Sequence, residues 1–547
     1  MGKNYVIGVD FGSDSVRAVI LDTASGKKAA QGVSAYSRWQ QGLYQHPEQN
    51  IFRQHPLDYL ESIEACVAEA LSQISTEEKK QIKGIGVDTT GSTPAPVDRN
   101  GVPLALLPEF AECEDAMFHL WKDHSAAQEA EEIQELFSHA DPDYTQYQGK
   151  YSSEWYWAKI LHTTRKNPRI RAAAYTWEEH SDWIIGELCA NTAPESCYHS
   201  ACAAGHKALW HSRWNGLPAE ECLEKLDPYL VLVAQRYGNA PQPATVKAGT
   251  LSPKWARKWG LSEEVVISGS SFDAHAGAVG AGIYHKTLVC TLGTSAVDML
   301  VAKPENLEGK DVRRYCGQAE NSIVPGCIGI ETGQASFGDD FAWFKRLLCW
   351  PLKQMAESGL DGAQELYRTA DDKLLVWLEE SARELPPEPF PIALDWFNGR
   401  RYPDTDDFQT AAITGLTLGV TAPMVYRALV FGVVCGLKRL VEGFEQEGVE
   451  IDQITAVGGV AGKSAYLMQM MSDALGKKVC ILDSEQTCAR GAAIYAAVAA
   501  GIFRDMPDAF TVMAAPKIRE YVPDPERNAF YQKQYARYLE LARKQDQ

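Results

Sequence analysis

The sequence lacks an apolar run long enough to cross a bilayer. The longest such stretches, residues 428–437 and 491–503, fall well short of the roughly 20 residues that a membrane-spanning helix needs, so we expect both to be buried helices. We also expect no signal peptide, because Asp10 interrupts the amino-terminal apolar run before it reaches the length of a signal core. Neither secretion nor a membrane partner is predicted.

Basic residues are in short supply. The 53 Lys and Arg face 72 Asp and Glu, which gives a formal net charge of −19 at pH 7. A surface of this sign repels phosphodiester backbones and anionic lipids, which argues against nucleic acid as a partner. A phosphate-bearing ligand must then be held by a local site.

Cysteine pairs and metal motifs are missing as well. The thirteen cysteines are scattered, form no CxxC and, being odd in number, cannot all pair. This pattern predicts a reduced, cytoplasmic protein without a disulfide framework or a zinc ribbon. No HExxH occurs, and we interpret His206, His211 and His275 as structural, hydrogen-bonded histidines rather than a metal set.

What the sequence does contain is a repeated hairpin pattern. Residues 5–22 (YVIGVDFGSDSVRAVILD) and 287–302 (TLVCTLGTSAVDMLVA) each place a small polar turn, GSDS or GTS, between two apolar runs. Such turns offer backbone N–H groups and hydroxyls to an anion without a bulky side chain in the way. Two copies about half the chain apart predict a duplicated α/β fold that grips phosphates from both sides, and hence an ATP-using enzyme.

The rest of the chain is compatible with two lobes. With 547 residues, 45% of them apolar, several cores can form. We place the amino-terminal lobe at residues 1–283 and the carboxy-terminal lobe at 284–547, joined near residues 282–287. Periodicity and turn residues predict helices at 56–74 and 422–444, and strands at 82–88, 265–267 and 454–457. They also predict a polar loop at 89–96 as a candidate substrate wall, an aromatic-packed insertion at 151–259, a long polar stretch to about residue 396 and a helical tail at 505–547.

The segment GGVAGKS, residues 458–464, is not a Walker A motif. That motif needs a glycine five positions before Gly462, and a valine stands there. A glycine pair between a strand and a helix can let an adenine or ribose lie flat against the backbone. It is equally typical of a tight strand-to-helix turn.

Several single residues have two interpretations each. Asp10, at a strand end before the first turn, suits Mg²⁺ binding or an Asx-turn. Asp273, within the small-residue segment 269–282, suits the general base of phosphoryl transfer to an alcohol or a helix N-cap. Arg17 suits a phosphate contact or a surface ion pair, and Lys207 a sugar contact or an ordinary surface lysine. The second hairpin favours function for Asp10 and Arg17.

The assembled motifs resemble those of the FGGY carbohydrate kinases over nearly the whole chain. General family elements are DFGSDSVRA, FDAHAGAVGAG, TLGTS and AVGGVAGKS. The segments VDTTGSTPAP, LWKDHSAA, YSSEWYWAKILH, AGHKALWH and LDWFNGRR are similar to the family members that phosphorylate L-ribulose in L-arabinose degradation. The resemblance implies a duplicated actin-like, or ribonuclease H-like, fold, with sugar bound mainly by the first lobe and ATP in the cleft between lobes.

The resemblance also implies individual roles. Asp273 falls on the catalytic base and Asp10 on the Mg²⁺-linked aspartate. The implied ATP-binding positions are Asp10, Gly12, Ser13, Asp14, Ser15 and Arg17 in the first turn, Thr294 in the second, Gly333 in the loop beside it, and Gly459 and Lys463 in the adenosine segment. The implied sugar positions are Ala95, Lys207, Glu331 and Asp273. Asp14 and Lys463 depart from relatives such as glycerol kinase, which carry Thr and Asn there.

The implied reaction is ATP plus L-ribulose giving ADP plus L-ribulose 5-phosphate, in a protein that can form a homodimer. Lys207 and Glu331 can grip a polyol through charge-assisted hydrogen bonds, which discriminate stereochemistry better than apolar contacts do. Two alternatives stay open. One is a kinase of the same fold for D-xylulose, ribitol or glycerol; the other is an actin-type or Hsp70-type protein in which ATP drives polymerisation or a conformational switch.

Overall fold

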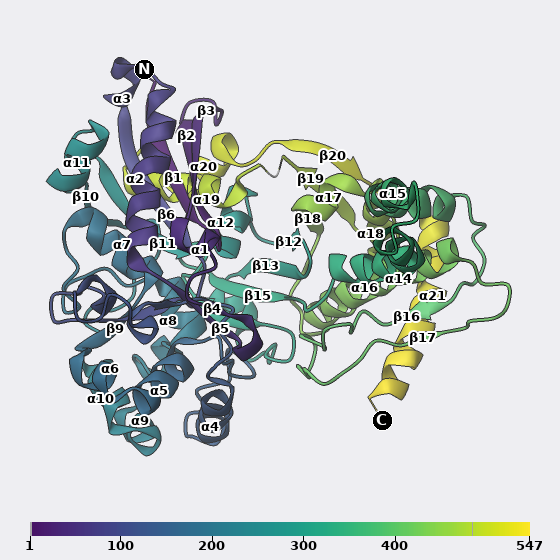
Figure 1. Cartoon of the computed structure of the whole chain (residues 1–547), viewed down its shortest axis with the longest axis horizontal. Helices are drawn as coiled ribbons and strands as arrows, with labels where there is room; N and C mark the ends of the chain where they lie inside the picture. The colour runs from purple at the N-terminus through teal and green to yellow at the C-terminus, as the bar shows by residue number, and fades with distance from the viewer. Residues whose placement is uncertain (1–2, 484, 547) are drawn as a thin grey trace.

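The computed structural model describes residues 3–483 and 485–546, and each half of the chain builds a large β-sheet (Figure 1). The first sheet has the strand order β10-β11-β6-β1-β2-β3. Strands β1 to β3 form an antiparallel meander, and β6 and β11 then add in parallel to β1. The strand bounds are β1 Tyr5–Phe11, β2 Ser15–Asp22, β3 Lys28–Ala35, β6 Ile82–Thr89, β10 Lys247–Thr250 and β11 Val266–Phe272.

The second sheet repeats this plan. Its order is β14-β15-β13-β12-β18-β19-β20, in which β12, β13 and β15 form the antiparallel meander and β18 and β19 add in parallel to β12. The bounds are β12 Thr287–Leu292, β13 Ala296–Ala302, β14 Gly317–Glu320, β15 Ile328–Gln334, β18 Gln453–Val457, β19 Lys478–Leu482 and β20 Lys517–Tyr521. The predicted hairpins and the predicted duplication of an α/β unit are therefore confirmed.

Helix α19 (Thr487–Ala499) connects the second half of the chain to the first sheet. It packs against β1 and β6, and against α12 (Asp273–Gly280), and Figure 1 shows it among the first strands of the chain. The approach is close because β1 and β6 present glycines to it: a Cβ on Gly8 or Gly86 would collide with the backbone oxygen of Ala489 or Ala492. Small residues on both sides thus let the two halves share one helix.

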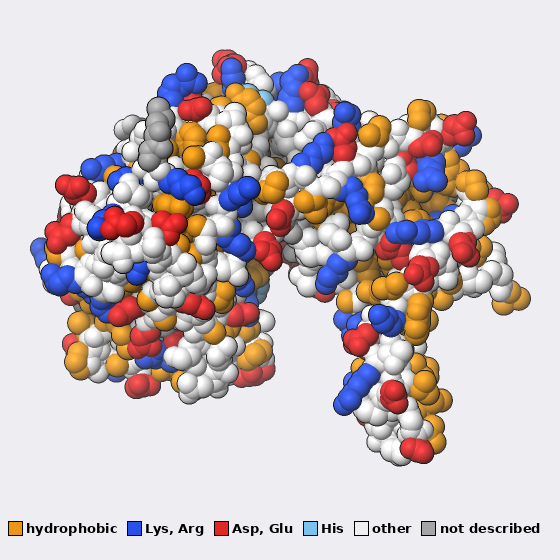
Figure 2. All heavy atoms as spheres, turned by 90° about the horizontal axis from the view of Figure 1, so that it is seen from above, with side chains coloured by type: hydrophobic (Ala, Val, Ile, Leu, Met, Phe, Trp, Pro, Cys, Tyr) orange, Lys and Arg blue, Asp and Glu red, His pale blue; other side chains and the backbone are white. Residues whose placement is uncertain are grey.

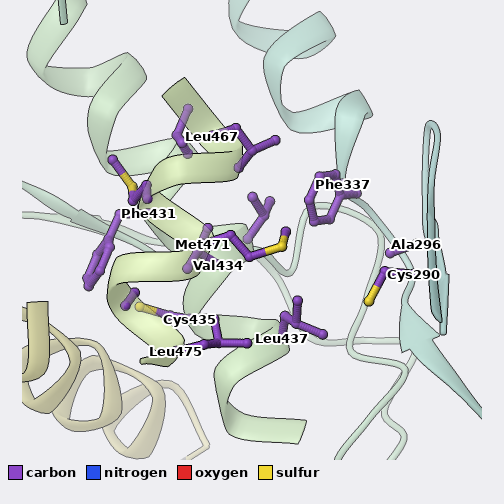
Figure 3. Packing of buried hydrophobic residues seen from close by; sticks show 14 of the residues in the cluster. Cys290, Ala296, Phe337, Phe431, Val434, Cys435, Leu437, Leu467, Met471 and Leu475 are labelled. Carbon is purple, nitrogen blue, oxygen red and sulfur yellow. The ribbon is translucent and has the colours of Figure 1, made fainter. Parts of the chain in front are cut away.

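A second core lies around the long buried helix α16 (Ala422–Gln446) of the second half. Phe431, Val434 and Leu437 of this helix pack with Leu467 and Met471 of α18 (Ala465–Leu475), as Figure 3 shows. Both helices are apolar along the buried face, which explains why residues 422–444 were predictable as a helix. The predicted helix at 56–74 is likewise confirmed as α2 (Pro56–Ser72).

Two segments of the second half contain elements that the sequence interpretation did not name. The predicted polar stretch before residue 396 contains a helical pair, α14 (Gly338–Glu357) and α15 (Ala363–Arg383), whose polar outer faces concealed a narrow buried stripe. The predicted helical tail contains α20 (Met506–Met513), the edge strand β20 and α21 (Pro525–Gln545). β20 carries no buried residue, so its pairing with β19 leaves no alternating apolar signal.

Between β6 and β11 the chain forms an aromatic-rich helical body, as predicted for the insertion. Trp157 and Trp177 are fully buried in it, with 0% and 1% of their surface exposed. The predicted polar loop at 89–96 is shorter than expected, because β7 (Pro94–Val97) pairs with β9 (Thr176–Glu179) in a separate two-stranded sheet. The helices of this body are α4 Ala127–Ser138, α5 Tyr156–Lys166, α6 Pro168–Ala173, α7 His180–Cys189, α8 Ala201–Lys207, α9 Glu220–Leu226, α10 Pro228–Gln235 and α11 Pro253–Trp259.

The surface is indented between a larger and a smaller body, and charges of both signs are interspersed over the face shown in Figure 2. Within the described ranges, no helix has the length and apolar character that a bilayer crossing requires. All thirteen cysteines fall inside those ranges as free thiols, which agrees with the prediction of a chain without a disulfide framework.

Candidate active site

The first turn, residues 12–15, joins β1 to β2. It is closed by a hydrogen bond of 3.0 Å from the Gly12 N–H to the Ser15 oxygen. Gly12 and Ser13 are partly exposed and Asp14 is exposed, whereas Ser15 is 8% exposed. The turn therefore presents backbone and short side chains at the strand ends, where an anion can approach.

Two tryptophans fix the side chains of this turn. Trp121 Nε1 donates to Ser13 Oγ at 3.0 Å, and Trp39 Nε1 donates to Asp14 Oδ1 at 3.3 Å. The position that departs from glycerol kinase is thus a carboxylate held by an indole. A carboxylate repels phosphate, so Asp14, held by Trp39, is better suited to orient the turn than to bind phosphate directly.

The second turn, residues 293–295, joins β12 to β13 and has the same closure, from the Gly293 N–H to the Ser295 oxygen at 2.9 Å. Its Thr294 side chain is exposed. The Thr294 oxygen accepts from the backbone N–H groups of Phe337 (2.8 Å) and Asp339 (3.1 Å), so the N-terminus of α14 sits beside the turn. Helix N-termini favour anions, which adds to the suitability of this turn for phosphate.

The predicted adenosine segment lies next to the second turn. Val457 pairs with Thr291 in the second sheet, and Gly458 follows with φ of 94°, where a Cβ would meet the Leu292 oxygen at 2.6 Å. Gly459 and Lys463 are the ends of the short helix α17 (Gly459–Lys463), both are exposed, and a Cβ on Gly459 would meet no atom within 4 Å. The glycine pair is therefore both a tight turn and an open backbone surface.

Gly333 is placed differently from the prediction. It lies in β15, paired with Val297 of β13, and not in a loop. Its φ of 150° and the collision that a Cβ would make with the Ala296 oxygen explain why glycine stands there. Its role near the second turn is one of close strand packing.

Three aspartates gather at the carboxyl ends of neighbouring parallel strands in the first sheet. Asp10 pairs in register with Asp88, Ser271 of β11 pairs with Asp88, and Asp273 follows at the first residue of α12. Asp88 is fully buried, and its carboxyl oxygens have no hydrogen-bond partner among the described residues. This carboxylate cluster stands where ligands bind in open α/β sheets.

Burial raises the pKa values of Asp10 and Asp88 in this cluster. Burial raises the pKa of Asp10, although Arg17, whose Nη1 lies 3.3 Å from Asp10 Oδ2, opposes that rise. Burial and the charges of Asp10 and Asp273 raise the pKa of Asp88 well above its ordinary value. Like charges at short range disfavour full ionisation, so the cluster is poised to accept a cation or to share a proton.

The environment of Asp273 raises its pKa. Burial, then the charge of Asp10, raises its pKa to about 7, while the Ala274 N–H, which donates to Asp273 Oδ1 at 2.7 Å, acts in the opposite direction. The N-cap of α12 is Phe272, so the predicted alternative of an N-capping Asp273 was wrong. A carboxylate with a pKa near 7 combines availability as a base with a useful driving force for proton transfer.

Lys207 and Glu331 form a pair across the two halves of the chain. Lys207, the last residue of α8, is 6% exposed, so the surface interpretation was wrong, and its Nζ lies 3.3 Å from Glu331 Oε2. The ammonium also lies over the rings of Trp155 and Phe272, at 5.1 and 5.9 Å from their centroids. The result is a charged, aromatic-walled polar pair of the kind that recognises sugars.

Two further residues reach Glu331 and were not predicted. His275 Nε2 lies 3.9 Å and Arg401 Nη2 4.0 Å from its carboxylate. Burial acts to raise the pKa of Glu331, but Lys207, His275 and then the remaining cations outweigh it and hold that pKa well below its usual range. Glu331 is thus a charged carboxylate that can accept hydrogen bonds from hydroxyl groups.

Ala95 is buried in β7, opposite Glu178 of β9. The backbone before it is held by Lys159, whose Nζ donates to the Ser92 oxygen at 2.8 Å, and by Glu179, which accepts from Ser92 Oγ and from the Thr93 N–H. Buried charged side chains therefore anchor this loop.

The predicted residues therefore fall into three groups. The first contains the first turn with the carboxylate cluster, the second the Lys207–Glu331 pair with its aromatic walls, and the third the second turn with the adenosine segment. The charges of Asp10, Glu331 and Lys207 all affect the pKa of Asp273. Asp273 is therefore electrostatically coupled to both of the first two groups. Within the described residues, no hydrogen bond or ion pair joins Thr294 or Lys463 to those groups.

Asp88 was missed as a site residue, although the sequence carried a signal for it. It ends a buried strand in IKGIGVDTT, and such strand-terminal carboxylates meet at one sheet edge. His275 and Arg401 had no comparable signal, since only the fold brings residues 275, 331 and 401 together. His275 Nδ1 and Nε2 have no hydrogen-bond partner in the described structure, which is consistent with a side chain available to a ligand.

Comparison with known proteins decides the family. The model described as the FGGY family of carbohydrate kinases, N-terminal domain, matches residues 5–204, and the corresponding C-terminal domain matches residues 288–500. The chain belongs to the FGGY family of carbohydrate kinases. The resemblance of the motifs to this family is confirmed, and with it the prediction of a carbohydrate kinase.

Individual relatives of this FGGY kinase extend over its full length. It is 41% identical over 548 residues to the ribulokinase of Vibrio parahaemolyticus, which covers 100% of this chain and 96% of that protein. It is 33% identical over 555 residues to the ribulokinase of Halalkalibacterium halodurans, covering 99% and 95%. The crystal structure of xylulose kinase from Rhodospirillum rubrum matches with a TM-score of 0.79 at 18% identity, over 98% of each chain. The duplicated actin-like fold is confirmed by that likeness.

Proposed function

We propose that this FGGY kinase transfers the γ-phosphoryl group of ATP to L-ribulose and forms L-ribulose 5-phosphate. The observation that carries the proposal is the environment of Asp273, which belongs to the carboxylate cluster, is affected by the charges of Lys207 and Glu331, and has a pKa of about 7. The full-length relatives named ribulokinase support L-ribulose as the sugar.

Asp273 accepts the proton of the attacking sugar hydroxyl. The sugar oxygen forms a bond to the γ-phosphorus, the bond from that phosphorus to the bridging oxygen breaks, and ADP leaves with the electron pair. Phosphoryl transfer needs little covalent help, so positioning and charge stabilisation supply most of the acceleration. A base that is half deprotonated near neutral pH is well matched to this step.

The sugar is oriented by Lys207 and Glu331. Their opposite charges offer a donor and an acceptor to neighbouring hydroxyls, and the Trp155 ring beside Lys207 provides an apolar face. A hydroxyl of the wrong configuration leaves one of these buried groups without a partner. Such a loss discriminates substrates more strongly than an apolar contact.

The nucleotide is assigned to the two turns and the adenosine segment. The first turn supplies backbone N–H groups and hydroxyls, and the second adds the exposed Thr294 beside the N-terminus of α14. The residues proposed for ATP are Asp10, Gly12, Ser13, Asp14, Ser15, Arg17, Thr294, Gly333, Gly459 and Lys463. Asp14 and Gly333 act through the shape of the backbone.

The carboxylate cluster fits Mg²⁺. Ligand atoms of Asp10 and Asp88 lie within 4.8 Å of each other, and the Asp88 oxygens have no hydrogen-bond partner among the described residues. Hard cations prefer such oxygen donors, so Asp10, with Asp88 behind it, would hold the ion. When bound, Mg²⁺ neutralises charge that develops on the phosphate oxygens.

A coupled ADP-release assay over the four 2-ketopentoses, ribitol and glycerol tests the proposal. We expect the highest kcat/KM with L-ribulose and little ADP release without sugar. Equal rates on D-xylulose and L-ribulose would contradict the narrow assignment and favour a broader ketopentose kinase. An ATPase rate indifferent to every sugar would instead favour an ATP-driven switch.

A further inference from the structure

A second cluster of metal-ligand side chains lies outside the phosphoryl-transfer site. Glu178 of β9 and Cys197 and His199 of the loop before α8 converge, with 3%, 3% and 1% of their surfaces exposed. Cys197 Sγ lies 3.6 Å from His199 Nε2 and 3.9 Å from Glu178 Oε1. These atoms come from two separate segments of the chain, so the fold alone creates the cluster.

The separations match a shared ion. For tetrahedral zinc, bond lengths of about 2.3 Å to sulfur and about 2.1 Å to nitrogen or oxygen place neighbouring ligand atoms about 3.6 Å apart. Ligand atoms of all three residues lie within 4.8 Å of one another, so only a small inward movement is needed. Glu178 also lies near the imidazole, with its Oε2 3.8 Å from His199 Nδ1. One carboxylate therefore reaches both the thiol and the ring.

The imidazole is oriented as a metal-binding histidine requires. Its Nδ1 lies 3.2 Å from Asp182 Oδ2, which leaves Nε2 directed at Cys197. Asp182 is itself fixed, because its Oδ1 accepts from the Ser200 N–H at 3.0 Å. A carboxylate on the far nitrogen of a histidine ligand sets the tautomer and strengthens metal binding.

We propose that Glu178, Cys197 and His199 bind one zinc ion. Thiolate and imidazole donors select zinc over magnesium or calcium, and a single carboxylate is a common third ligand. A cavity of about 540 Å³ lined by Cys197, His199, Asn239 and Lys247 gives the ion a route from solvent and room for a water as fourth ligand. Since the site is separate from Asp273, the metal has a structural role.

The site is placed to brace the sugar side of the enzyme. Glu178 pairs in register with Ala95 across β7 and β9, and Ser200 begins the turn into α8, which ends at Lys207. An ion held between β9 and the start of α8 therefore ties together the two elements that carry Ala95 and Lys207. Loss of the ion should loosen sugar binding more than nucleotide binding.

Cobalt substitution of the full-length protein tests the site. Protein stripped with a chelator and reloaded with Co²⁺ should bind about one ion per chain and show a thiolate-to-cobalt charge-transfer band. Cys197→Ser should abolish the band, whereas Cys202→Ser, at an equally buried cysteine five positions on, should retain it. Absence of the band in the wild type, or an unchanged band in Cys197→Ser, would overturn the proposal in favour of a metal-free hydrogen-bonded cluster.

Two further variants keep the test independent of the folding of Cys197→Ser. His199→Gln should also remove the band, and Asp182→Asn should weaken Co²⁺ and Zn²⁺ binding by about 10- to 100-fold while the band persists at saturation. The zinc content of the wild type after incubation with Zn²⁺ gives a direct stoichiometry. Equal metal affinity in wild type and both variants would overturn the site.

Discussion

Lys207 and Glu331 lie in opposite halves of the chain, and the Lys207 Nζ is 3.3 Å from Glu331 Oε2. Lys207 ends α8 beside the first sheet, and Glu331 lies in β15 of the second. Neither residue has its partner nearby in the sequence, so the pair exists only when the two halves are assembled. A sugar bound there bridges both halves, and binding is therefore coupled to their relative position.

Lys207→Met should impair sugar binding selectively. The substitution keeps the aliphatic length and the contact with the Trp155 ring but leaves the Glu331 carboxylate without its main counter-charge. We expect the KM for L-ribulose to rise by about 10- to 100-fold, with the KM for ATP nearly unchanged. Steady-state kinetics with each substrate varied in turn measures both. Lys166→Met, at an exposed lysine, is the matched control and should behave as wild type.

Asp273→Asn should remove catalysis and leave the structure intact. The amide is isosteric and can still accept the Ala274 N–H through its oxygen, but it cannot take up the sugar proton. We expect kcat to fall by about 10²- to 10⁴-fold, with nucleotide affinity and melting temperature close to wild type. Glu263→Gln, at an exposed carboxylate, controls for loss of one negative charge. A variant that retained wild-type kcat would exclude Asp273 as the base.

The pH profile of kcat/KM should follow the ionisation of Asp273. The pKa of this group in the folded protein is raised to about 7, and only the deprotonated form accepts a proton. Activity should therefore be low below that pKa and rise with pH through about 7, approaching tenfold per pH unit on the acidic limb. A profile that is flat across this range, at constant Mg²⁺ and with ATP saturating, would contradict the assignment.

An element could be predicted from the sequence where an apolar pattern marks the face that it buries in the fold. The two hairpins and the helices α2 and α16 were predictable because an apolar run or stripe marks each of them. The pair α14 and α15 was not, since most of its surface is exposed, and β20 was not, since edge pairing needs only backbone groups. In each case tertiary contacts supply what the local pattern lacks.

The residues of the candidate site also divide into those that the sequence could predict and those that it could not. Asp10 lies at the end of a predicted strand, and Thr294 and Gly459 follow predicted strands, so their place at a sheet edge could be inferred from the sequence. The roles of Lys207 and Glu331 came only from the resemblance to a family, because spacing cannot indicate a contact between residues 124 positions apart. Neither the sequence pattern nor the family resemblance predicted that His275 and Arg401 converge on Glu331.

Gly86→Ala tests the packing that joins the two halves. A Cβ at this position of β6 would collide with the backbone oxygen of Ala492 in α19, and a backbone atom cannot rotate away. We expect the free energy of unfolding to fall by about 1–3 kcal/mol, because either the strand or the helix must shift. Chemical denaturation measures this free energy, and Gly419→Ala, at an exposed glycine where the nearest atom is 3.9 Å away, is the control.

Because α19 also packs on α12, the displacement that Gly86→Ala causes should reach Asp273 and lower kcat as well. Stability equal to that of Gly419→Ala would mean that the contact between α19 and the first sheet is looser than the structure indicates.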